Sequence, residues 1–129
     1  MTRINCIPVQ ELNRRHLTAE YYELPRIFTS VRNLLEKGKD PAEVDMPKEY
    51  VLGTGHMKFF YNKLGWLAAR YADLHIEMRA RGMNPSPIQA LLLDLPEHLI
   101  QQWEPTKKAM KLNRERIAER EKTMKSTAK

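Results

Sequence analysis

The stretch that decides the fold is LTAEYYELPRIFTSVRNLL, residues 17–35. Its apolar side chains recur at steps of four and three, which is the spacing of one face of an α-helix about six turns long. These side chains are Leu17, Tyr21, Leu24, Phe28, Val31 and Leu35. Pro25 lies inside the stripe and lacks a backbone N–H, so we expect a bend near residues 21–25. Gly38 predicts where the helix ends.

A second apolar stripe with the same spacing follows a loop-like segment, residues 40–55, that is rich in proline and glycine. Gly82 predicts the end of the corresponding helix. The members of this stripe are Phe60, Leu64, Leu67, Tyr71, Leu74 and Met78. A last helix, about residues 106–125, carries Met110, Ile117 and Met124 at heptad spacing amid dense charge.

The connectors and the tail complete the fold prediction. Prolines break the chain at residues 84–87, and we expect short helical turns at 87–93 and 96–103, the second capped by Asp94. We see no alternating strand pattern of useful length. The sequence therefore predicts a compact all-α single domain of three main helices with irregular connectors over residues 1–129, ending in a frayed tail at 126–129.

The composition points to a basic globular protein that meets polyanions. The 129 residues are 42% hydrophobic and 29% charged, which is ordinary for one soluble domain. Lysine and arginine give a net charge of +6 and a pI near 9.5, so the surface attracts nucleic acid. The cations crowd after Thr106, where they fit either a solvated helix with local ion pairs or a stripe that faces phosphates.

Cysteine usage and hydropathy suggest where the chain works. Cys6 is the only cysteine, which excludes an internal disulfide and fits a reducing compartment. No run of about 18 apolar residues exists, and the N-terminal stretch is too short and polar for a signal peptide. We expect a cytoplasmic protein, in a nucleoid or a virus-infected cell, with no membrane partner.

No metal or cofactor motif is present, so we expect neither a metal nor an organic cofactor. The four histidines match no two-ligand spacing, and Gly53-Thr54-Gly55 is a turn rather than a dinucleotide loop. Polar residues instead crowd the first helix, where His16, Glu20 and Glu23 step by four and three along one face. From spacing alone, a row of surface ion pairs explains them as well as a site does.

Two blocks of the chain resemble the pyrimidine-dimer DNA glycosylase family. The resemblance is dense over residues 1–28 and 52–64 and thin after 83. The first block contains MTRIN (1–5), VQEL (9–12), HL (16–17), AEY (19–21) and ELPR (23–26), and the second contains LGTGH (52–56), FFY (59–61) and KL (63–64).

The resemblance implies a glycosylase that is also an abasic-site lyase and that acts on double-stranded DNA containing a lesion. It implies that Thr2 supplies a free amine once Met1 is removed, and that Glu23 is the essential acid. Three further residues match positions that line the family's DNA-facing site: Arg3, His16 and Arg26. We expect the protein to act as a monomer. A non-catalytic basic DNA-binding module and a protein-binding chain are the alternatives.

The implied chemistry agrees with the properties of an α-amine. Its unperturbed pKa is about 7.7–8.0, against about 10.4 for lysine, so a useful fraction is a neutral nucleophile near pH 7. The amine can attack the sugar C1′ and form an imine, which permits β-elimination of the 3′ phosphate. A nearby carboxylate can stabilise the positive charge that develops on the sugar and can shuttle protons.

The chain departs from the family pattern at two places. Tyr22 stands where the family has arginine, and no aromatic residue follows Trp103, where the family has an aromatic tail. Because positions 22, 23 and 26 of a helix lie close together, we expect Tyr22 to share the face of Glu23 and Arg26 and to contact DNA. The alternative is that Tyr22 packs beside Tyr21. These departures leave open whether the lesion is a pyrimidine dimer or another damaged base.

Overall fold

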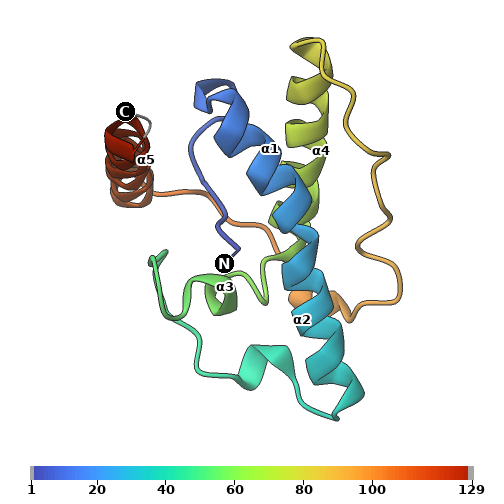
Figure 1. Cartoon of the computed structure of the whole chain (residues 1–129). Coiled ribbons are helices and arrows are strands. Elements are labelled where there is room, and N and C mark those ends of the chain that lie inside the picture. Colours follow the sequence, from blue (N-terminus) through green and yellow to red (C-terminus); the bar gives the residue numbers. More distant parts are fainter. Residues whose placement is uncertain (1, 128–129) are drawn as a thin grey trace.

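The chain folds into α-helices joined by irregular connectors (Figure 1). The computed structural model describes residues 2–127, with side chains described as far as Lys122. The α-helices are α1 (Arg14–Glu23), α2 (Pro25–Glu36), α3 (His56–Phe59), α4 (Leu64–Ala80) and α5 (Lys107–Thr127), and the 3-10 turns are η1 (Val9–Glu11), η2 (Pro41–Glu43) and η3 (Glu97–Leu99). Within the described residues, pairing of the β type is limited to one isolated bridge between Lys63 and Ile100. The all-α prediction is confirmed.

The first predicted helix is divided at Pro25 into α1 and α2. Leu24 ends α1 and precedes α2 with helical dihedral angles, φ −54° and ψ −41°. Pro25 is the first residue of α2. The N–H groups at the beginning of a helix have no intrahelical partner, so a proline there costs no hydrogen bond. The predicted bend is therefore a break between two helices that follow one another directly. At the other end of α1, the Asn13 side chain caps the helix by accepting from the His16 N–H at 2.9 Å.

The two predicted stripes form the core where α1 and α2 meet α4 and the residues before it. The Tyr21 and Tyr71 rings stack with centroids 4.8 Å apart, one from each stripe. Every member of the two stripes is buried except Leu35, which is partly buried. Phe60 belongs to the second stripe but precedes α4, because the chain forms α3 over His56–Phe59 where we expected loop and the beginning of the stripe.

The connector between α4 and α5 is less helical than predicted. Residues 83–90 form no helix, and the turn expected at 87–93 is found only at 91–94. Pro85 and Pro87 remove two N–H donors there. Helical structure in the second expected turn is limited to η3, and Asp94 does not cap it because its own φ is +59°.

The N-terminal segment, residues 2–8, runs between α5 and the α1–α4 pair (Figure 1). Helix α5 begins one residue later than predicted and includes Ser126 and Thr127. Residues 128–129 of the expected frayed tail lie outside the described part of the chain. In that part no helix has the length and apolar character needed to cross a bilayer.

Candidate active site

Buried side chains hold the main chain of the N-terminal segment. The Ile4 N–H donates to His56 Nε2 at 2.8 Å, and the Tyr50 hydroxyl donates to the Ile4 carbonyl at 2.9 Å. His56 Nδ1 lies 2.7 Å from the Val51 carbonyl, so its proton is on Nδ1 and Nε2 is free to accept. Burial lowers the pKa of His56, which favours this neutral form. Thr2, at the end of the segment, is only 4% exposed.

A buried polar network joins the same segment to α1 and α4. The Asn5 amide donates to Glu20 Oε1 at 2.8 Å, and Arg70 donates to both Glu20 oxygens at 2.7 and 3.0 Å. Arg70 also donates to the Ile7 carbonyl. Glu20 is therefore an interior residue and takes no part in a row of surface ion pairs.

A cavity of about 230 Å³ lies between the N-terminal segment, α1 and α5. His16, Glu20 and Glu23 all line it from α1, as their spacing predicts. The remaining lining residues are Arg3, Asn5, Ala19, Arg116 and Arg120. Two of the predicted site residues from α1 and one from the N-terminal segment therefore face one open cavity, together with two arginines of α5.

The cavity is strongly cationic and has donors without partners. Burial, and then the charges of Arg116 and Arg120, lower the pKa of Arg3, which shows how closely the guanidinium groups are crowded. His16 Nε2 and Arg116 Nε are buried without a hydrogen-bond partner among the described residues, although another nitrogen of Arg116 lies 3.6 Å from Glu119. Burial also lowers the pKa of His16. Such a cavity suits an anionic ligand with several oxygens.

The comparison with known protein families agrees with a nucleic-acid ligand. The family model described as pyrimidine dimer DNA glycosylase matches residues 1–91. The chain belongs to this family. The protein is thus a DNA repair enzyme of the glycosylase class, and its match extends from the N-terminal segment through α4. Helix α5, which supplies Arg116 and Arg120 to the cavity, lies beyond the matched region.

Tyr22 and Arg26 of this glycosylase lie outside the cavity. Tyr22 is 48% exposed and packs edge-on against Tyr21, with ring centroids 5.1 Å apart. Its hydroxyl accepts from the Ser86 N–H at 3.0 Å, and this contact lowers the pKa of Tyr22. Arg26 is exposed on α2. It lies just after the break at Pro25 and does not line the cavity that Glu23 lines.

Arg116 and Arg120 are site residues that the sequence reasoning did not single out. They belong to the basic run after Thr106, for which the sequence left a phosphate-facing stripe open. Their spacing of four residues places them on one face of α5. The heptad residues Met110 and Ile117 indicate the inward side of α5, but no periodicity reveals the contact between α5 and the N-terminal segment that brings these arginines to the cavity.

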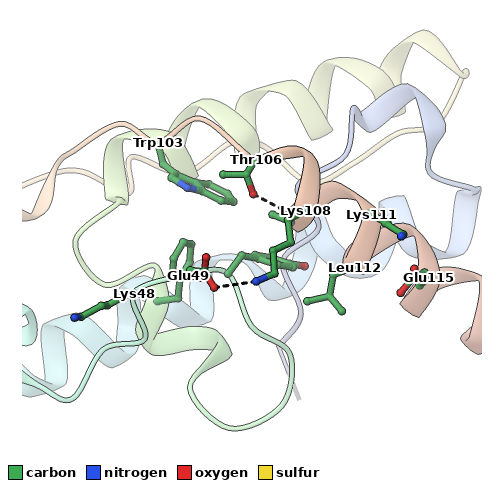
Figure 2. Close-up of a pocket in the computed structure, with 11 residues that line it drawn as sticks. Lys48, Glu49, Trp103, Thr106, Lys108, Lys111, Leu112 and Glu115 are labelled. Atoms are coloured by element: carbon green, nitrogen blue, oxygen red, sulfur yellow. Dashed lines mark hydrogen bonds and ion pairs between the residues drawn. The ribbon is translucent and has the colours of Figure 1, made fainter.

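A second cavity, of about 290 Å³, lies at the beginning of α5 (Figure 2). Tyr50 and Trp103 line it with their rings stacked at 6.0 Å, and Trp103 also meets Phe59 edge-on at 5.1 Å. Lys108 lies 3.3 Å from Glu49 across its mouth. These rings pack against one another, and the lysine faces a carboxylate. We therefore interpret this cavity as part of the packing between α5 and the loop before α3.

Proposed function

We propose that this glycosylase is also an abasic-site lyase whose nucleophile is the amine of Thr2, freed when Met1 is removed. One observation carries the proposal: the rigidly held N-terminal segment ends beside a cationic cavity that also contains the Glu23 carboxylate. Thr2 directly precedes Arg3, which lines that cavity. Met1 lies outside the described residues.

The proposed reaction begins with attack of the Thr2 amine on C1′ of the damaged nucleotide. The glycosidic bond breaks, the base leaves with its bonding electron pair and a proton, and the opened sugar is held as an imine on the amine. Loss of a C2′ proton then breaks the C3′–O bond and expels the 3′ phosphate. Water finally hydrolyses the imine and restores the amine.

Glu23 is the proposed proton carrier and charge stabiliser. Its carboxylate lines the cavity and makes no hydrogen bond or ion pair with any described residue, whereas the neighbouring Glu20 is fully bonded to Asn5 and Arg70. This carboxylate shares the cavity with three arginines, and it can face the positive charge that builds on the sugar.

The cationic residues are proposed to hold lesion-containing double-stranded DNA. Arg3 and His16 would bind the phosphates that flank the lesion, together with Arg116 and Arg120. Arg26 and Tyr22, outside the cavity, stay predicted contacts to the flanking duplex. Because one chain contains every group that the reaction needs, we propose that the protein acts as a monomer without a cofactor.

Borohydride trapping on DNA with a single abasic site tests the proposal. The free N-terminal amine is expected to form a covalent protein–DNA adduct, and a protein acetylated at that amine is expected to form none. Normal trapping by the acetylated protein would assign the reaction to a lysine. Mass spectrometry of the purified N-terminus checks that Met1 is absent. If the protein binds the DNA but forms no adduct, it has no lyase activity, as the non-catalytic alternative predicts.

A further inference from the structure

The N-terminal segment and α5 meet at one fully buried side chain, Asn113. Its Oδ1 accepts from the Cys6 N–H at 2.7 Å and from the Ile7 N–H at 3.2 Å. Its amide donates to the Asn5 side-chain oxygen at 2.7 Å. All of these bonds run from α5 to the segment that carries Thr2.

Other hydrogen bonds and ion pairs between α5 and the rest of the molecule lie at the surface. Lys108 pairs with Glu49 (Figure 2), and these side chains are 81% and 70% exposed. Arg114 meets Glu11 with both side chains about half exposed, and the Asn13 amide donates to Glu121 Oε1 at 2.6 Å at an exposed position. Exposed pairs contribute little to stability and are screened by salt. The apolar contacts of α5 are made by Ala109 and three partly buried residues, which turn one side of the helix inward but are less directional than hydrogen bonds. Asn113 is thus the one fully buried polar side chain on α5 within residues 107–122.

Asn113 lies on the same face of α5 as the two arginines of the cavity. Arg116 and Arg120 follow it by three and seven residues, which is one stripe of a helix. On its other side Asn113 reaches Asn5, and Asn5 bonds to Glu20 of α1, three residues before Glu23. A continuous chain of buried hydrogen bonds therefore joins the helix that carries the arginines to the helix that carries Glu23.

We infer that Asn113 is a positioning residue that fixes Arg116 and Arg120 relative to Thr2 and Glu23. The inference rests on the proposed function, because the distance it sets matters only if these groups act on one substrate. Directional, buried hydrogen bonds hold such a distance where surface ion pairs do not. Without Asn113, α5 loses its buried polar contacts to the N-terminal segment, so Arg116 and Arg120 shift relative to Thr2 and Glu23.

Two measurements on Asn113→Ala test the inference. The first is affinity for abasic-site duplex as a function of salt, where loss of two phosphate contacts lowers the log–log slope by about two. The second is the borohydride trapping rate at saturating DNA, which is expected to fall about tenfold to a hundredfold because the reacting groups lose their alignment. Leu112→Ala is the matched control, since Leu112 is partly buried on α5 but lines the second cavity. It is expected to lower Tm and leave both readouts within about twofold, because it touches no group of the site.

The outcomes separate positioning from general destabilisation. A folded Asn113→Ala with unchanged slope and rate overturns the inference, and so do equal losses in Asn113→Ala and Leu112→Ala. If Asn113→Ala does not fold, Asn113→Ser carries the same two readouts, because its hydroxyl can still accept one N–H. If the unsubstituted protein forms no borohydride adduct, the proposed lyase activity is refuted. The salt dependence of DNA affinity still shows whether Asn113 positions the arginines.

Discussion

The Tyr22 hydroxyl accepts a hydrogen bond from the main-chain N–H of Ser86 at 3.0 Å. The neighbouring Tyr21 hydroxyl donates to the Ser86 carbonyl at 2.6 Å. Two adjacent tyrosines of α1 therefore satisfy both main-chain polar groups of one connector residue. Residues 83–90 form no helix or strand, so Ser86 has no main-chain partner of that kind. The two tyrosine hydroxyls provide the hydrogen bonds that a helix or sheet would otherwise provide.

Tyr22→Phe is expected to loosen the connector without disturbing the ring packing. The variant removes one partly exposed hydrogen bond, so the free energy of unfolding falls by about 0.5–1.5 kcal/mol at most. Amide hydrogen exchange at Ser86 becomes faster. Arg32→Met is the matched control, because it releases the Leu91 and Leu93 carbonyls of the same connector instead. Faster exchange at Ser86 in both variants to the same extent would show that Tyr22 holds nothing specific.

Tyr22→Arg tests whether this residue also selects the lesion. It introduces the cation of the family pattern beside α1, so activity on pyrimidine dimers is expected to rise relative to other lesions in a glycosylase panel. Tyr22→Phe, which lacks the cation, is expected to leave the ranking as it is. If Tyr22→Arg leaves the ranking unchanged as well, Tyr22 serves the connector alone.

Glu23→Gln is expected to stop base removal while DNA binding persists. The substitution keeps the size of the side chain and removes the charge that is proposed to stabilise the developing positive sugar, so the rate on an intact lesion falls by about two to four orders of magnitude. The readout is single-turnover base release at saturating DNA. Wild-type rates would return Glu23 to the role of a surface carboxylate.

Arg70→Met is expected to be the most destabilising of these changes. Glu20 has a fully buried side chain and Arg70 is 6% exposed, so removing Arg70 leaves a carboxylate without its counter-charge, at a cost of about 3–5 kcal/mol. Arg81→Met breaks the Arg81–Glu77 pair, whose side chains are 26% and 17% exposed, and is expected to cost about 1 kcal/mol or less. Urea unfolding of the two variants compares these costs, and equal losses would contradict the assignment of Glu20 to the interior.

Acid is expected to destabilise the protein through His56. Burial lowers its pKa in the folded state, whereas the unfolded imidazole titrates near 6.5. Below about pH 6.5 the unfolded state therefore binds the proton more tightly, and stability is lost at up to about 1.4 kcal/mol per pH unit. His56→Gln removes this contribution and keeps that of His16. Parallel pH profiles of unfolding free energy for the two proteins would refute the assignment.

The sequence predicts the parts of the molecule whose apolar residues have a regular helical spacing. The stripes at 17–35 and 60–78 have helical spacing, so the helices and their buried faces follow from them, and Pro25 marks the break. His16, Glu20 and Glu23 share a predicted face, and they do line one cavity. Their spacing does not distinguish Glu20 from Glu23, however, because Arg70, fifty residues later, is what makes Glu20 interior.

The heptad residues Met110 and Ile117 indicate the inward side of α5, and both pack against the core. Asn113 lies between them on that side, but the sequence does not show which groups it bonds. Its burial depends on main-chain groups at Cys6 and Ile7. The extended connector was missed because its partners are side-chain hydroxyls on α1 and α4 rather than its own main chain.

The contact between Cys6 and Asn113 also sets an order of events during synthesis. These residues are 107 positions apart, so the N-terminal segment acquires this partner only when almost the whole chain has been made. At about 5–20 residues per second, translation of that length takes about 5–20 s. During this interval the end of the chain is open to the aminopeptidase that would remove Met1. Thr2 is buried in the folded chain, so we expect removal of Met1 to precede completion of the fold.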